Sequence, residues 1–245
     1  FSSLLHNLIL TPSRNTKIKL LQDYFKKLDI NRAYALAILS DQLSFQFIKA
    51  SKLRELVYEQ VDQHLFDYSY DYVGDLAETI SLIWPTKKEG KSQNLSTLIE
   101  NIKKIKKSEI NTEFSKMLSE LSNNERWTLI KICTGGLRIG VSERLVKTAL
   151  ADLYNKSVNE IEEIWHGLEF PYENLFGWLK NETSKPRIDF KKLFHPMMLA
   201  NPIDQQTDFK RLNAIEFQAE YKWDGIRVQL MVSSKSVSLY SRTGD

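Results

Sequence analysis

The sequence is poor in the residues that form covalent cross-links and zinc sites. Only one of its 245 residues is a cysteine, Cys133, so an intrachain disulfide is excluded. A lone thiol is typical of a reducing, intracellular compartment, and this one is expected to fill the core beside Ile130 and Ile132. The histidines are too scattered to predict a zinc site, and the one before Pro196 is expected to be structural; they are His6, His64, His166 and His195.

Long apolar runs and a strong net charge are also missing. No apolar stretch approaches the roughly 20 residues that a membrane-spanning helix needs, and the N-terminus lacks the order of a signal peptide. We therefore expect a soluble protein that does not contact membranes. With 34 basic and 31 acidic residues, attraction to nucleic acid would have to come from local patches. A hydrophobic content of 42% is ample for a packed core.

Apolar residues recur at helical spacing from Leu4 to about Trp178. The clearest stripe is surrounded by lysines and consists of Leu95, Leu98, Ile99, Ile102 and Ile105. Similar patterns predict helices at roughly 16–28, 31–40, 51–60, 71–84, 113–121, 125–133, 142–154 and 158–168. Ser157 and Glu160 have the spacing of a capping box, which marks the start of the last of these.

The pattern changes after Lys210, where alternating apolar residues predict strands at Phe217–Tyr221, around Ile226–Val232 and at Val237–Tyr240. The last two strands are expected to be joined around 233–235. Polar composition predicts a loop at 86–94 and an interdomain connection at 181–192. We thus expect a multidomain protein of α and α+β class. Its all-α domain would cover 1–180, its linker 181–192 and the incomplete start of a β-rich domain 193–245. The first residue, Phe1, and the polar last residues indicate a fragment.

A lysine motif of the form K-x-D-G-x-R lies in the β-rich region, as Lys222, Asp224, Gly225 and Arg227. A lysine amine made neutral by its surroundings can attack phosphorus and form a phosphoramidate. The glycine permits a close approach of a ligand, and the arginine can donate to ribose or phosphate oxygens. By itself the motif is equally consistent with a solvated lysine, an ordinary Asp-Gly turn and a surface arginine.

A glycine-rich turn precedes the helix predicted at 142–154 and reads Gly135-Gly-Leu-Arg-Ile-Gly140. Backbone amides, Arg138 and a helix N-terminus together suit a phosphate, and Arg144 and Lys147 extend the basic surface. The alternatives are a simple Gly-Gly helix terminator and an arginine that pairs with an acid. The lysines at 103–107 are more typical of a solvated helix face than of a DNA groove.

These motifs together resemble the ATP-dependent DNA ligases. Glu220-Tyr-Lys-Trp-Asp-Gly-Ile-Arg227 resembles their adenylation motif, and Ser241-Arg-Thr-Gly-Asp245 resembles the segment that follows it. The resemblance extends over almost the whole chain, through His195–Ala200, Thr134–Ser142, Tyr72–Glu78 and Thr11–Arg14. It is strongest to the bacterial subfamily called cisplatin damage response ATP-dependent DNA ligase, in which a helical DNA-binding domain precedes a nucleotidyltransferase domain.

The resemblance implies a role for each motif residue. Lys222 would carry AMP from ATP, Glu220 and the Tyr221 backbone would contact adenine, and Arg227 and Arg242 would hold ribose and phosphate. Asp224 could orient the loop or influence the lysine, and Trp223 could pack or stack. With the resemblance, the glycine-rich turn and the helix after it are the predicted DNA contacts, at Arg138, Gly140, Arg144 and Lys147.

The implied enzyme seals nicks in double-stranded DNA in repair or recombination, with ATP and Mg²⁺, as a monomer in the bacterial cytoplasm and nucleoid. The family's later carboxylate and lysine motifs and its OB-fold are missing from the sequence, so the chain alone is not expected to ligate. Two alternatives stay open. One is an RNA ligase or capping-type nucleotidyltransferase, and the other is a non-catalytic DNA-binding helical module.

Overall fold

A computed structural model describes residues 1–27, 29–43, 47–85, 92–135, 137–189, 194–195, 202–233 and 236–241. The chain divides into two compact units. The first consists of Phe1–Lys156 and Phe170–Glu173, and the second of Ser157–Glu169 and Asn174–Asp245. Within the described residues, no helix is long and apolar enough to cross a bilayer.

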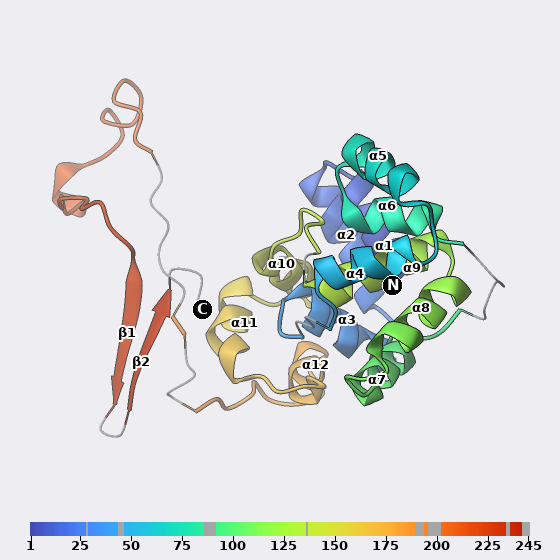
Figure 1. The fold of residues 1–245 in the computed structure, drawn as a ribbon. Coiled ribbons are helices and arrows are strands. Elements are labelled where there is room, and N and C mark those ends of the chain that lie inside the picture. Colours follow the sequence, from blue (N-terminus) through green and yellow to red (C-terminus); the bar gives the residue numbers. More distant parts are fainter. Residues whose placement is uncertain are drawn as a thin grey trace. The chain divides into compact units, whose positions relative to one another are not determined.

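The first unit is helical (Figure 1). Its helices are α1 (Ser2–Leu10), α2 (Arg14–Phe25), α3 (Asn31–Leu39), α4 (Ala50–Tyr58), α5 (Gln63–Val73), α6 (Leu76–Ile83), α7 (Leu95–Lys104), α8 (Ile110–Glu120), α9 (Asn123–Thr134) and α10 (Glu143–Tyr154). Closely packed pairs include α2 with α10 and α6 with α9. The all-α prediction for this part of the sequence is confirmed.

Helix ends follow the local chemistry of the sequence. Ser122 and Glu125 form a capping box at the start of α9, so two amides without helical partners are satisfied. The single helix predicted at 71–84 is wrong, because Gly74 takes a left-handed conformation with φ of 75° and ends α5. Asp75 then accepts a hydrogen bond from the Glu78 amide at 2.9 Å and begins α6.

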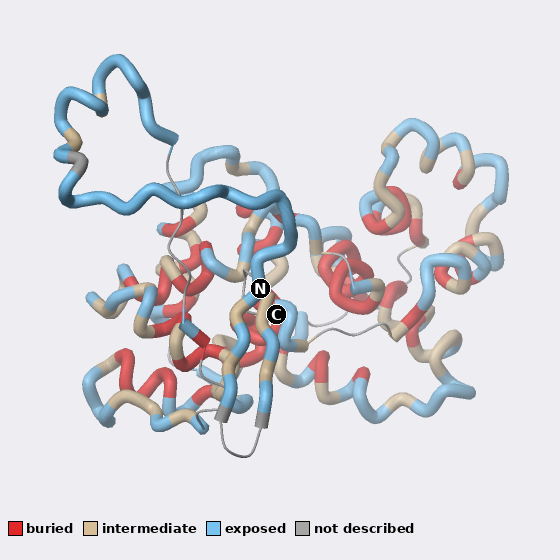
Figure 2. The backbone as a smooth tube through the Cα atoms, turned by 90° about the vertical axis from the view of Figure 1, so that its left-hand side faces the viewer, coloured by how far each residue is buried: buried red, intermediate tan, exposed pale blue. Residues whose placement is uncertain are grey.

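Burial is concentrated in the helices (Figure 2). The core of the first unit contains apolar side chains from α1 to α10, together with Cys133, which is a free, buried thiol as expected. One charged side chain, Arg126, is fully buried. It donates to the carbonyl oxygens of Leu118 at 2.7 Å and Ser81 at 2.8 Å. It also donates to those of Leu121 at 3.0 Å and Trp84 at 3.1 Å, so it satisfies the C-terminal ends of both α6 and α8.

The second unit begins with α11 (Val158–Ile164), the 3₁₀ helix η1 (Trp165–Gly167) and most of α12 (Glu173–Leu179). The predicted capping box at Ser157 and Glu160 is confirmed. A further 3₁₀ helix, η3 (Ala214–Glu216), precedes an antiparallel pair of strands, β1 (Val228–Ser233) and β2 (Ser236–Ser241). Leu230 pairs with Leu239 and Val232 with Val237, as expected for a hairpin around 233–235.

The strand predicted at Phe217–Tyr221 is not formed, and these residues are exposed. Alternating apolar residues produce a strand only when a neighbouring strand satisfies their backbone groups. Among the described residues, only β1 and β2 pair with each other. The prediction therefore fails here because it depends on a tertiary partner.

The residues predicted as an interdomain connection pack against α11, η1 and α12 over the described part, 181–189. Lys185 forms an ion pair with Glu163 at 2.6 Å. Ile188 lies so close to Gly167 that a β-carbon on this glycine would collide with it. This segment is therefore held by specific contacts, whereas the domain boundaries themselves stay a prediction.

Candidate nucleic-acid interface and lysine motif

The glycine-rich turn between α9 and α10 has an unusual backbone. Gly135 ends α9 with φ of 76°, Arg138 has φ of 41° and Gly140 has φ of 65°. A left-handed conformation is unfavourable for arginine, so the surrounding structure must stabilise it. Ile139 is only 3% exposed and anchors the turn in the core, while Arg138 is exposed. Gly136 lies outside the described residues. The turn thus presents Arg138 to solvent from a firmly held backbone.

Lys17 on α2 holds this turn. Its ammonium donates to the carbonyl oxygens of Gly140 at 2.9 Å and Ile139 at 3.2 Å. A β-carbon on Gly140 would lie 2.6 Å from the Lys17 nitrogen, so a glycine is needed there both for this contact and for the positive φ. The motif analysis missed Lys17, because a single lysine on an amphipathic helix carries no local signal of a partner 122 residues away.

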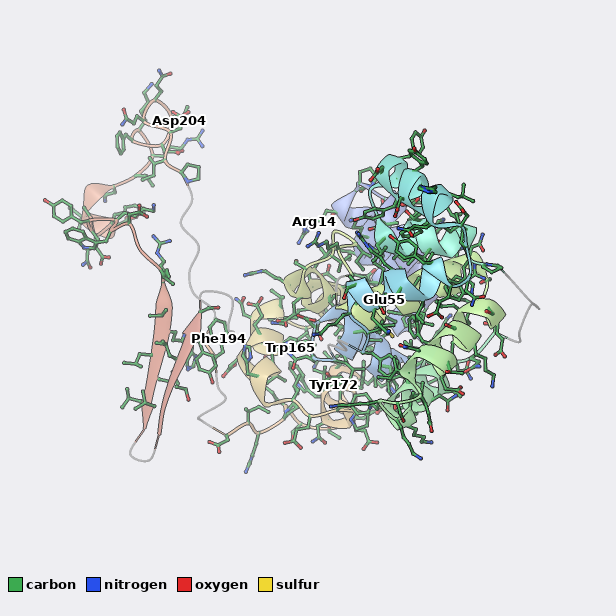
Figure 3. All side chains as sticks on the ribbon, viewed as in Figure 1. Arg14, Glu55, Trp165, Tyr172, Phe194 and Asp204 are labelled. Carbon is green, nitrogen blue, oxygen red and sulfur yellow. The ribbon has the colours of Figure 1, made fainter. Side chains whose placement is uncertain are left out.

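Arg14 belongs to the same side of α2 as Lys17, because residues three apart are neighbours on a helix surface. Its exposed side chain lies at the first position of α2 (Figure 3). Ser13 caps this helix by accepting from the Thr16 amide at 3.4 Å. The start of α2 therefore adds positive charge beside the turn that Lys17 holds.

The start of α10 supports only part of the predicted basic surface. Ser142 caps the helix by accepting from the Leu145 amide at 3.3 Å, and Arg144 is exposed. Lys147 is 3% exposed and forms an ion pair with Glu143. Lys147 thus neutralises a carboxylate within the fold, which weighs against a direct phosphate contact. Burial, and after it the same Glu143 carboxylate, raises the pKa of the Tyr172 hydroxyl to about 12.

The lysine motif lies on an extended, exposed segment before β1. Lys222, Asp224 and Arg227 are exposed, and nothing lies within 4 Å of a β-carbon built on Gly225. Among the described residues, no cluster of His, Cys, Asp and Glu could hold a metal ion. Arg242 lies outside the described residues.

Within the part of the chain that the structure describes, the side chains beside Lys222 contact near neighbours. The Glu220 carboxylate accepts a hydrogen bond from the side-chain amide nitrogen of Gln218 at 3.1 Å. The rings of Tyr221 and Trp223 lie 5.9 Å apart and are 89% and 82% exposed. The segment therefore contains an amine at Lys222, a carboxylate at Asp224 and a guanidinium at Arg227. These are the donor and acceptor types that a nucleotide requires.

The hairpin that follows the lysine motif is attached to the helical part of the second unit. Gln229 on β1 accepts from the His195 amide at 2.9 Å and donates to the His195 carbonyl at 2.7 Å. The ring of Phe194 (Figure 3) lies 5.5 Å from that of His166 and 5.7 Å from that of Tyr240. His195 thus acts through its backbone, and no described contact gives its ring a ligand-binding role.

Two family models match the chain in succession. The model described as DNA ligase N terminus matches residues 1–151, and the one described as ATP dependent DNA ligase domain matches residues 197–245. The first contains α1 to α9 and most of α10, including Lys17 and the Arg138 turn. The second contains the Lys222 motif and the hairpin.

Curated relatives agree with these models. A DNA ligase from Nitrosopumilus maritimus (strain SCM1) is 34% identical over 134 residues, which are 53% of this chain and 23% of the relative. A probable DNA ligase from Koribacter versatilis (strain Ellin345) is 32% identical over 134 residues, 53% of this chain and 22% of the relative. The match therefore spans less than a quarter of either relative. The two family models and these relatives show that the chain belongs to the ATP-dependent DNA ligase family.

Proposed function

We propose that the protein containing this chain seals nicks in duplex DNA through a covalent lysyl-AMP intermediate. The observation that carries this proposal is the order of two features within one chain. The helical unit presents Arg138 from a glycine-rich turn that Lys17 holds by hydrogen bonds. The Lys222 motif follows at the start of the adenylation domain. DNA attachment and nucleotide transfer are the two activities that nick sealing requires.

Lys222 is the proposed nucleophile. Its neutral amine attacks the α-phosphorus of ATP, a nitrogen–phosphorus bond forms, pyrophosphate leaves and the amine proton passes to solvent. The 5′-phosphate of the nick then attacks the adenylate and displaces the lysine. Finally the 3′-hydroxyl attacks this phosphate and releases AMP. Mg²⁺, when bound, would neutralise charge on the phosphates, and no described residue is assigned to it.

Other residues of the motif would bind the nucleotide. Glu220 and the Tyr221 backbone would contact adenine, and Arg227 and Arg242 would donate to ribose and phosphate oxygens. Support comes from the residue types and from the exposure of the three described side chains, which leaves them accessible to a ligand. These roles require the segment to be covered by further structure, because phosphoryl transfer is favoured where water is excluded.

The proposed DNA surface consists of Arg138, Gly140 and Arg144, with Arg14 on the neighbouring helix. Exposed arginines and backbone amides at the start of α10 can hold phosphates without reading the base sequence. Such binding suits an enzyme that must act on nicks in any sequence. Lys147 is left out of this surface because of its burial and its pairing with Glu143.

The catalytic proposal is tested by covalent transfer of label from α-labelled ATP, with Mg²⁺, to the whole protein. Label should disappear with Lys222→Ala and persist with Lys210→Ala, a matched exposed lysine in the same unit. A folded whole protein, freed of bound AMP, that takes up no label would refute the mechanism and favour a non-catalytic DNA-binding module. Preference for labelled GTP would instead indicate capping-type chemistry.

The DNA surface is tested by measuring the affinity for nicked duplex at several salt concentrations. Arg138→Met should reduce the slope of log affinity against log salt by about 0.9, the value for one phosphate contact. Lys17→Met should weaken binding mainly through Arg138, so the double variant should bind little worse than Arg138→Met. Lys19→Met removes the same charge from an exposed site on α2. Equal effects of Lys19→Met and Arg138→Met would refute this assignment.

The resemblance to the cisplatin damage response subfamily supports a role in DNA repair, with a monomeric enzyme acting on the bacterial nucleoid. Loss of the gene should increase sensitivity to DNA cross-linking agents, and unchanged sensitivity would contradict the repair role. RNA ligation is distinguished by comparing nicked DNA with nicked RNA as acceptors.

A further inference from the structure

A surface on α5 combines exposed aromatic rings with acidic charge and has no part in the proposed ligase chemistry. Leu65 is 57% exposed, Tyr68 is 75% exposed and Tyr72 is 92% exposed. At 100° per residue these side chains lie within about 60° of one another around the helix. We call Leu65, Tyr68 and Tyr72 the α5 stripe.

The opposite side of α5 accounts for how the helix is held. Phe66 is fully buried, and its ring stacks on that of Tyr70 with centroids 6.1 Å apart. The Tyr58 hydroxyl on α4 donates to Asp67 at 2.8 Å. The helix is thus secured through other residues, and the α5 stripe is not needed for packing within the described part of the unit.

Acidic residues predominate in the sequence around the α5 stripe. Between Glu55 (Figure 3) and Trp84 the sequence has no lysine and no arginine, although the chain contains 34 of them. The same stretch contains seven acidic residues, which are Glu55, Glu59, Asp62, Asp67, Asp71, Asp75 and Glu78. All but Asp67 and Asp75 are exposed. Glu55 pairs with Lys52 and Asp75 with Lys131, so the negative potential of this surface comes from the other exposed acids, Glu59, Asp62, Asp71 and Glu78.

The sign of this charge determines which partner fits. Nucleic acid and anionic lipid would be repelled. A symmetric contact between two copies would place the same acidic residues opposite one another, which is unfavourable. Tyrosine is common at the centres of protein interfaces and can bind a cation on its ring. Arg54 already lies 4.6 Å from the Tyr70 ring centroid, so this helix accepts a guanidinium against an aromatic face.

We propose that the α5 stripe is a docking site for a protein segment that carries lysine or arginine beside an apolar side chain. The apolar side chain would pack against Leu65 and the tyrosine rings, and the cations would face Asp71 and the flanking acids. Such a contact would join the ligase to a partner protein without occupying the Arg138 surface. Its existence does not depend on nucleotide transfer.

The test is a selection of random 16-residue displayed peptides on the whole protein, with counter-selection on a Tyr68→Ala/Tyr72→Ala variant. The selected peptides should carry an excess of Lys and Arg and at least one apolar residue. Their affinity should fall at least tenfold with the double variant and with Asp71→Lys, and weaken with salt. Leu10→Ala is the matched control, because Leu10 is 68% exposed on α1.

Several results would overturn the proposal. These are the absence of any peptide that survives the counter-selection, surviving peptides that are neutral or acidic, binding unchanged by Asp71→Lys, or an equal loss with Leu10→Ala. Concentration-dependent dimerisation that the double variant abolishes would assign the stripe to a second copy. Displacement of the peptides by nicked duplex would assign it to DNA. Peptide binding is measured without ATP, so the two proposals are tested independently. Absence of peptide binding would not contradict the ligase proposal, and absence of adenylation would not contradict the docking proposal.

Discussion

Replacement of Arg126 by methionine should destabilise the helical unit severely. This guanidinium is fully buried and is the common donor for the C-terminal carbonyls of α6 and α8. Methionine occupies a comparable volume but offers no donor, so four backbone carbonyl oxygens would lose this partner. Burial lowers the pKa of Arg126, which is the direction expected for a desolvated cation.

The magnitude follows from the hydrogen bonds that are lost. Each bond to a charged donor contributes about 1.5–3 kcal/mol, and four of them lie between 2.7 and 3.1 Å. Loss of the unfavourable desolvation of the cation offsets part of this sum. We therefore expect a net loss of about 3–5 kcal/mol, the range for breaking one side of a buried charged network. At roughly 2–4 °C per kcal/mol, the melting temperature should fall by about 10 °C.

The assay is urea unfolding followed by circular dichroism, with Arg14→Met as the control. Arg14 is an exposed arginine on α2, and its replacement should change the free energy of unfolding by less than about 0.5 kcal/mol. Arg126→Lys should lie between the two, because an ammonium can reach some but not all of the carbonyls. A loss below 1 kcal/mol for Arg126→Met would refute the view that this side chain joins the two helix ends.

Three further predictions concern other contacts. Asp75, whose pKa is raised by burial but lowered by more through Lys131 at 2.5 Å and the backbone amides that it caps, has a folded pKa below its usual value. Its stabilising effect should therefore be full above about pH 4 and disappear as pH falls through the folded value, so Asp75→Asn should cost about 1–2 kcal/mol at pH 7 and progressively less as pH falls below about 4. Burial raises the pKa of Cys133, so this thiol should react with iodoacetamide only on unfolding, and rapid labelling of the folded protein would contradict its burial. Gly167→Ala should push Ile188 away and speed trypsin cleavage after Arg187, whereas Gly225→Ala, which meets no atom within 4 Å, should leave the cleavage rate unchanged.

Much of the helical architecture was predictable from local pattern. The stripe from Leu95 to Ile102 marks α7, and the capping box at Ser157 marks α11, because helix formation depends on residues within one or two turns. One exception is 71–84, where apolar periodicity continues through Gly74 although the backbone turns there. A glycine inside a periodic pattern is ambiguous until its conformation is known. In addition, α1, most of α5 and α12 lie outside the predicted helix ranges.

The residues of the candidate site also fall into two groups, those that local sequence identified and those that only the structure identified. Arg138 and Lys222 were identifiable because their neighbours form short motifs with a chemical purpose. Lys17 and Lys147 were not distinguishable by type or spacing, since both are lysines on amphipathic helices. One holds the turn that presents Arg138, and the other pairs with Glu143 below the surface.

The sequence by itself therefore determined the helical class of the first unit, the hairpin, the buried thiol and the two motifs of the ligase family. Tertiary structure alone decided which lysine supports the Arg138 turn, which arginine joins α6 to α8, and which aromatic rings stay at the surface of α5. Local pattern specifies conformation through contacts a few residues apart. Burial and ion pairing depend on contacts between residues far apart in the chain, so they are settled only when the helices pack.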